Sequence, residues 1–215
     1  MIKHLLFDLD NTLYSSSLPM ENEVTRRMVQ FAADFLNVSF EKAYEMRFGK
    51  DARYSTTLEW LMSEYGLSDT EEFFCRVHPE SELSELVFDP ELRPFLRSLN
   101  MPMTILTNAP RIHADRVLRF LKIDDLFLNV IDVETNNLKG KPYADAFMNA
   151  LSASGFSVDE TLFFDDYPSY LMGFQNLGGK TVLVGQNAPP PGLNCFHIKS
   201  IYETPRILRE CGIAG

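Results

Sequence analysis

The stretch His4–Thr12, with the sequence HLLFDLDNT, decides the fold that the sequence predicts. Its first four residues lack a regular alternation of polar and apolar side chains, which is typical of a strand buried on both faces of a parallel sheet. Two carboxylates and a hydroxyl follow directly after this run. Ligands of open α/β sheets bind outside the carboxyl ends of the strands, so these polar side chains are candidate functional groups.

Further short apolar runs predict more strands of the same kind. Helical segments separate the later runs, because 114–121 and 144–151 each place apolar side chains on one helical face. Strands that alternate with helices indicate βαβ units, so we expect an α/β fold with a doubly wound parallel sheet. The predicted strands are His4–Phe7, Met103–Leu106, Val130–Val133, Leu162–Phe164, Lys180–Val184 and Cys195–Ile198.

The segment between the first two predicted strands has a different pattern. Apolar residues from Met20 to Leu36 recur with a period of 3.6 residues, which indicates an amphipathic helix. Helical patches continue over 40–48, 56–65 and 70–77. We therefore expect an all-helical domain at residues 15–89, inserted into a discontinuous core domain made of residues 1–14 and 90–215.

Polar side chains follow several of the predicted strands at the point where each strand ends. Asp8, Asp10 and Thr12 follow the first strand, Thr107 and Asn108 follow the second, and Lys141 lies in the turn after the third. Asp165 and Asp166 follow the fourth. The carboxyl ends of parallel strands meet at one edge of a sheet, so four carboxylates, a hydroxyl and a lysine are expected to converge there.

This set of residue types suits phosphoryl transfer. Neighbouring carboxylates disfavour each other's ionisation, and a hard divalent cation such as Mg²⁺ relieves the conflict. A carboxylate can also act as a nucleophile and form an aspartyl-phosphate. Mg²⁺ and Lys141 would neutralise the transferring oxygens, and Thr107 would donate a hydrogen bond. Asp10 would reach the leaving oxygen and alternate as general acid and base.

Composition narrows the classes of protein that the chain can belong to. The 30 acidic against 20 basic residues disfavour binding to a nucleic-acid polymer, which depends on clustered Lys and Arg. No run of 18 apolar residues is present, and Asp8 and Asp10 interrupt the segment that a signal peptide would need. Three scattered cysteines form no disulfide framework. We expect a cytoplasmic protein without membrane contact; its oligomeric state is open.

The ordered set of motifs resembles the four motifs of the haloacid dehalogenase (HAD) superfamily. They are Asp8-x-Asp10-x-Thr12, Thr107-Asn108, Lys141-Pro142 and Asp165-Asp166. The resemblance covers almost the whole chain, and it implies a Rossmann-like core with a helical cap domain. Within the superfamily the chain is most similar to the pyrimidine 5′-nucleotidase branch, on the segments Val77-His78, Thr107-Asn108-Ala109, His113-Ala114, Val117-Leu118, Gly140-Lys141-Pro142 and Leu162–Asp166.

The resemblance implies roles for the residues at the predicted sheet edge. The implied catalytic residues are Asp8 as nucleophile, Asp10 as general acid and base, Thr107 and Lys141. Phosphate would be bound by Thr107, Asn108 and Lys141. Members of the superfamily that displace halide lack an acid at the position of Asp10, so Asp10 favours phosphoryl chemistry.

The resemblance also implies a Mg²⁺ cofactor. Asp8, the main-chain carbonyl of Asp10, and Asp166 would hold the ion, with Asp165 in contact with it or directly behind its ligands. The implied activity is a Mg²⁺-dependent phosphatase of small phosphorylated metabolites, with a pyrimidine 5′-nucleotidase as one form of it. A sugar phosphomutase and a catalytically weak protein that binds a phosphate ligand or a partner remain as alternatives.

The chain departs from that branch in two places. Tyr167 and Tyr170 stand where the branch usually has Ser and Asn, near the expected metal site. In the helical insertion, Trp60 replaces a glycine of the branch. Candidates for contact with a leaving group are Arg47, Arg53, Tyr54 and Trp60, whereas His78 and His113 are interpreted as structural or exposed side chains.

Overall fold

The first strand, β1 (His4–Phe7), lies in the middle of a parallel sheet. The computed structural model describes residues 1–14, 18–49 and 53–213. All four residues of β1 are buried, since β2 (Met103–Leu106) and β4 (Thr161–Asp165) pair with it on either side. Burial on both faces explains why the run has no polar alternation.

The six strands are arranged in the order β3-β2-β1-β4-β5-β6, and every neighbouring pair is parallel. The chain winds outward from β1 to one edge and then from β4 to the other, as in other doubly wound folds. The predicted α/β fold class is therefore confirmed. The outer strands are β3 (Asn129–Ile131), β5 (Lys180–Val184) and β6 (Phe196–Ile198).

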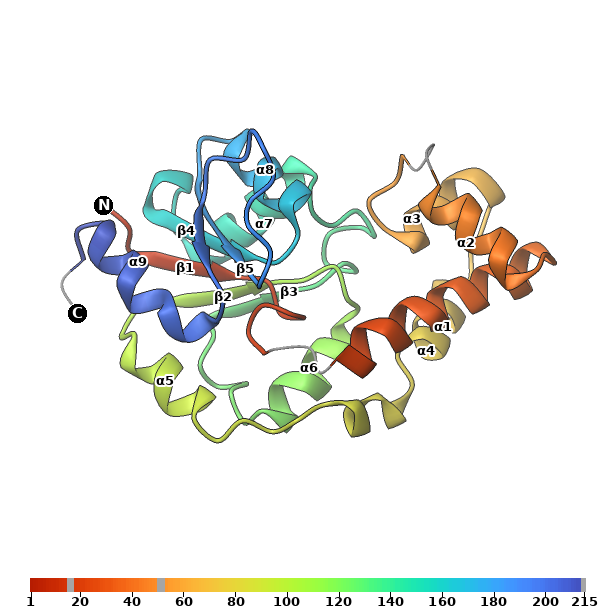
Figure 1. Ribbon diagram of the computed structural model, residues 1–215, viewed down its shortest axis with the longest axis horizontal. Coiled ribbons are helices and arrows are strands. Elements are labelled where there is room, and N and C mark those ends of the chain that lie inside the picture. Colours follow the sequence, from red (N-terminus) through yellow and green to blue (C-terminus); the bar gives the residue numbers. More distant parts are fainter. Residues whose placement is uncertain (15–17, 50–52, 214–215) are drawn as a thin grey trace. The chain divides into compact units, whose positions relative to one another are not determined.

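Helices cover both faces of this sheet (Figure 1). On one face, rings from α7 (Ala144–Ser154), β4 and α8 (Pro168–Gln175) meet in the core: the centroids of Phe147, Phe163 and Phe174 lie 5.3 to 5.5 Å apart. Aromatic burial of this kind stabilises a core strongly. The helices of this part are α5 (Leu92–Ser98), α6 (Arg111–Phe120), α7 (Ala144–Ser154), α8 (Pro168–Gln175) and α9 (Thr204–Glu210), with short 3₁₀ turns at Val158–Glu160 and Ile201–Glu203.

Contacts divide the chain into a core unit, Met1–Ser15 with Phe88–Gly215, and a helical unit, Ser16–Val87. The helical unit contains α1 (Leu18–Leu36), α2 (Phe40–Phe48), α3 (Thr57–Tyr65), α4 (Thr70–Val77) and a 3₁₀ helix at Glu80–Glu85. Side chains of Ser39, Thr56 and Asp69 cap the first turns of α2, α3 and α4. The domain boundary predicted at residue 15 lies outside the described residues.

Several predicted elements have different bounds in the structure, and two of them have a clear local cause. The third strand ends at Ile131 rather than Val133, because Asp132 turns the chain by accepting hydrogen bonds from the Thr135 amide and hydroxyl at 2.9 and 3.0 Å. Helix α6 begins at Arg111, directly after Pro110, and so three residues earlier than the apolar pattern predicts. Among the residues described, no helix is long and apolar enough to span a bilayer.

The buried side chain of His4 predicts a response of the fold to acid. Its Nδ1 and Nε2 each lie 3.0 Å from a threonine hydroxyl, those of Thr161 and Thr104, and burial lowers the His4 pKa from 6.5 to about 4. Between these pH values the unfolded chain binds a proton that the folded chain does not. The free energy of unfolding should therefore fall on acidification, by up to about 3 kcal/mol from this group.

Urea denaturation at pH 7 and at pH 4 measures this response. The variant His4→Gln keeps a hydrogen-bonding side chain but cannot titrate, so it should lose less stability over the same range. Equal losses in the two proteins would show that His4 does not contribute.

Candidate active site

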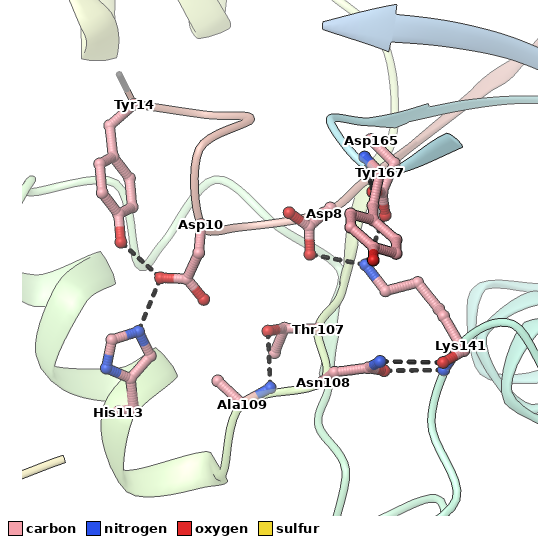
Figure 2. A network of polar contacts seen from close by, with 10 residues as sticks. All are labelled: Asp8, Asp10, Tyr14, Thr107, Asn108, Ala109, His113, Lys141, Asp165 and Tyr167. Carbon is pink, nitrogen blue, oxygen red and sulfur yellow. Dashed lines mark hydrogen bonds and ion pairs between the residues drawn. The ribbon is translucent and has the colours of Figure 1, made fainter. Parts of the chain in front are cut away.

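Asp8 stands at the carboxyl end of β1, in the centre of the sheet edge (Figure 2). Its amide donates to the Phe164 carbonyl at 2.9 Å, which continues the pairing of β1 with β4 for one more residue. The side chain is buried, and its Oδ1 accepts a hydrogen bond from Lys141 Nζ at 2.6 Å. The neighbouring strand thus fixes the backbone of Asp8, and a buried ammonium fixes one of its carboxylate oxygens.

Asp165 ends the adjacent strand β4 and faces the same ammonium. Lys141 Nζ lies 2.6 Å from Asp165 Oδ2, while the other oxygen accepts from the Tyr167 amide at 2.8 Å. Both oxygens are therefore engaged by donors of the chain itself. Asp165 is fully buried, whereas its neighbour Asp166 is partly exposed.

The burial of these groups creates an electrostatic conflict. Burial raises the pKa of Asp8 well above its ordinary value; Lys141 opposes this rise, and Asp165, Asp166 and Asp10 add to it. Burial also raises the pKa of Asp165, again against the attraction of Lys141. One ammonium shared by two buried carboxylates thus leaves an excess of negative charge at the end of β1 and β4.

A divalent cation fits this acidic cluster. Asp8, Asp165 and Asp166 each offer a carboxylate oxygen, and these oxygens lie within 4.8 Å of one another. Hard cations such as Mg²⁺ prefer oxygen ligands and are commonly held by one or two carboxylates. The donor chemistry and the uncompensated charge both agree with a metal site at this point.

Lys141 is held in place by its main chain as well as by its side chain. Asn108 donates from Nδ2 to the Lys141 carbonyl at 2.9 Å and accepts at Oδ1 from the Lys141 amide at 2.7 Å. A Cβ at Gly140 would lie 1.9 Å from the same Oδ1, so only glycine permits this approach. Asn108 therefore orders the lysine loop, and its predicted contact with phosphate stays a prediction.

Aromatic rings also surround the Lys141 ammonium. The Tyr170 and Phe163 ring centroids lie 5.1 and 5.6 Å from Nζ, within the range of cation–π attraction. Burial raises the pKa of Tyr170 to about 12, so its phenol stays protonated at neutral pH. Tyr170, one of the two departures from the nucleotidase branch, thus packs against the lysine.

Thr107 follows β2 and lies on the other side of Asp8 in the sheet order. Its side chain is buried, and Oγ1 accepts a hydrogen bond from the Ala109 amide at 3.0 Å. As this oxygen accepts from the loop, its own proton is directed elsewhere and can be donated. The loop after β2 therefore presents a hydroxyl at the same edge as the carboxylates (Figure 2).

Asp10 has two partners that the sequence does not reveal. Its Oδ1 accepts a hydrogen bond from the Tyr14 hydroxyl and lies 2.7 Å from His113 Nε2. His113, interpreted from the sequence as structural or exposed, is buried in the first turn of α6 and touches the predicted general acid. A helix that follows β2 begins at the sheet edge where β2 ends, so the sequence places His113 near this edge but does not specify its contact with Asp10.

The helical unit has a cavity of its own, of about 230 Å³. All four residues proposed from the sequence for contact with a leaving group line it. Arg47 is buried there, and its guanidinium donates to Thr57 Oγ1 at 3.0 Å and to the Ser55 carbonyl at 3.2 Å. The lining residues are Met46, Arg47, Arg53, Tyr54, Trp60, Glu64 and Tyr65.

Comparisons with known proteins agree with this fold. A glyceraldehyde 3-phosphate phosphatase of Pyrococcus abyssi is 28% identical over 194 residues, which span 85% of this chain and 81% of the relative. The structure resembles that of a HAD phosphatase from Thermococcus onnurineus, with a TM-score of 0.67, 21% identity and 96% and 98% of the two chains covered.

The same fold also carries a different chemistry. An L-2-haloacid dehalogenase of Xanthobacter autotrophicus superimposes with a TM-score of 0.61 at 16% identity, covering 97% of this chain and 99% of the other. Similarity at this level shows the fold alone, so the reaction has to be argued from the site. The sequence model of the haloacid dehalogenase-like hydrolase family matches residues 2–178, and the chain belongs to this family of hydrolases.

Proposed function

We propose that the chain is a phosphatase that hydrolyses small phosphate monoesters. The observation that carries the proposal is the buried Lys141 ammonium, 2.6 Å from both Asp8 and Asp165, at the sheet edge where Asp10 also stands. A dianionic phosphoryl group needs fixed positive charge beside the nucleophile, and Lys141 provides it. Asp10 supplies an acid next to the nucleophile, as phosphate ester cleavage requires.

The proposed reaction has two displacements. An oxygen of Asp8 attacks phosphorus, the bond from phosphorus to the ester oxygen breaks, and Asp10 gives its proton to the departing alcohol. The Asp8 acyl phosphate is then attacked at phosphorus by water, whose proton returns to Asp10, so that inorganic phosphate leaves and both carboxyl groups are restored. Lys141 and the Thr107 hydroxyl bind the phosphoryl oxygens throughout.

A Mg²⁺ ion is part of the proposal. The carboxylates of Asp8 and Asp166 and the main-chain carbonyl of Asp10 would hold it. Asp165 would stand behind these ligands, since both of its oxygens accept hydrogen bonds from Lys141 and Tyr167. When bound, the ion would offset the repulsion between the carboxylates and the phosphate.

The requirement for metal gives a direct prediction. Excess chelator should lower phosphatase activity by at least about 100-fold, and added Mg²⁺ should restore it, because phosphoryl transfer depends on neutralised charge. Asp166→Asn should raise the Mg²⁺ concentration for half-maximal activity about tenfold or more, since loss of even an outer partner of a metal ligand weakens metal binding by about 10- to 100-fold. Asp159→Asn, a change of the same type in a 3₁₀ turn, is the control. Full activity in excess chelator would exclude the metal.

Two observations suggest different leaving groups for the substrate. The relative from Pyrococcus abyssi acts, by its name, on glyceraldehyde 3-phosphate, and the sequence motifs resemble pyrimidine 5′-nucleotidases. An assay of phosphate release with Mg²⁺ over triose phosphates, sugar phosphates and pyrimidine and purine monophosphates distinguishes the two. A phosphosugar isomer formed without phosphate release would indicate a phosphomutase, and no turnover on the panel would favour a phosphate-binding protein.

A further inference from the structure

The surroundings of Asp10 carry an inference beyond the hydrolysis itself. Asp10 lies in the loop after β1, and two side chains meet one of its oxygens, Oδ1. Tyr14 is four residues further along the same loop, whereas His113 is 103 residues away on α6. Figure 2 shows the carboxylate between the Tyr14 ring and the His113 ring. All three residues belong to the core unit.

An ionised carboxylate oxygen can only accept, so the Tyr14 hydroxyl and the Nε2–H tautomer of His113 both donate to Oδ1, and two donors on one oxygen fix the orientation of the carboxylate. Asp10 lies beyond the end of β1, so no strand pairing holds its backbone. The next residue, Asn11, has a φ of 62°, and the backbone leaves the extended form there. The Asp10 side chain is about one-third exposed, whereas the side chains of His113 and Tyr14 are both buried and packed on more sides. The two buried partners therefore determine where the carboxylate points.

We propose that His113 and Tyr14 are positioning residues for proton transfer by Asp10, an inference that rests on the proposed phosphatase function. Because Oδ1 accepts both hydrogen bonds, the proton that Asp10 gives to the leaving oxygen is carried by Oδ2. As the O–H bond at Oδ2 breaks, the negative charge that develops on the carboxylate is stabilised by the two donors at Oδ1. The same orientation lets Oδ2 accept the proton of water in the second displacement.

This role predicts a dependence on the leaving group. Phenyl phosphate and p-nitrophenyl phosphate are nearly the same size, but phenolate needs protonation as it departs and p-nitrophenolate does not. Loss of the positioning contacts should therefore slow phenyl phosphate about tenfold or more and p-nitrophenyl phosphate less than about threefold. A purely structural role of His113 or Tyr14 would slow both substrates by the same factor.

The variants are chosen so that the fold survives. Tyr14→Phe removes only the hydroxyl, and His113→Leu removes the ring donor, whereas His113→Gln keeps an N–H donor and should recover part of the rate on phenyl phosphate. The matched controls are Tyr202→Phe, whose hydroxyl donates to Asp89 at 2.6 Å, and His197→Gln, whose Nε2 lies 2.9 Å from the Gly185 carbonyl. Both controls should leave the ratio of the two rates unchanged.

The outcomes separate this inference from the proposed function. If the wild-type protein hydrolyses both esters and the Tyr14 and His113 variants change their rates equally, the positioning role is wrong and the phosphatase stands. If the wild-type protein hydrolyses neither ester nor any compound of the substrate panel, both proposals fail. A selective loss on phenyl phosphate with recovery in His113→Gln supports the inference.

Discussion

Replacing Asp8 with Asn is expected to abolish phosphatase turnover while leaving the protein folded. The amide cannot form the acyl phosphate, so kcat should fall by at least about 10⁴-fold. Removal of a covalent nucleophile lowers kcat by this order of magnitude in other enzymes. The fold should survive, because an amide oxygen can still accept the hydrogen bond from Lys141 at the position of Oδ1. Asn also removes a buried charge that Asp165 and Asp166 repel.

Two measurements check this expectation. Release of inorganic phosphate gives the loss of activity, and thermal unfolding should give a melting temperature at or above that of the wild-type protein. Asp132→Asn is the matched control, since Asp132 is also a buried carboxylate that directly follows a strand, β3, and its partners are Thr135 and, at 4.0 Å, Arg111. Hydrolysis by the Asp8→Asn variant at the wild-type rate would remove Asp8 as nucleophile.

The fold could be predicted from the sequence because its central strands β1, β2 and β4 are buried on both faces. In a chain with short loops, a short apolar run such as Leu162–Phe164 indicates a buried strand. The alternation of such strands with helices then predicts a parallel sheet. The exact ends of the strands and helices were harder to predict from the sequence. Asp132 ends β3 through hydrogen bonds of its side chain, and Pro110 sets the start of α6, so local bonding overrides the apolar pattern at both places.

The candidate site was predictable where its residues follow strands directly. Asp8 and Thr107 directly follow their strands and Asp165 is the last residue of β4, so topology alone brings all three to one edge. The contacts of His113 with Asp10 and of Asn108 with the Lys141 main chain could not be predicted, since each joins loops or helices over long sequence separations. Such contacts depend on how a helix is rotated on the sheet, which no apolar run specifies.

Replacement of Lys141 is expected to cause the second large loss of activity. Among the residues that the structure describes, it is the only group seen to bridge two buried carboxylates. Burial lowers the pKa of Lys141, yet Asp165 and Asp8 raise it more, so the side chain stays charged at neutral pH. Lys141→Met keeps the length of the side chain and removes the charge. Phosphatase kcat should fall at least about 10³-fold, since the phosphoryl oxygens would face uncompensated carboxylates.

The same variant should be less stable in the absence of metal. Removal of one partner from a buried ion pair costs about 3 to 5 kcal/mol, so urea denaturation in excess chelator should show a loss on this scale. Adding Asp165→Asn to Lys141→Met removes one of the stranded charges and should recover part of the stability without recovering activity. Lys139→Met, at an exposed lysine two residues away, should change neither quantity.

If Lys141→Met were as active as the Lys139 variant, the positive charge beside Asp8 would have no part in catalysis. The proposal would then lose the observation on which it rests, whatever the stability measurement gave.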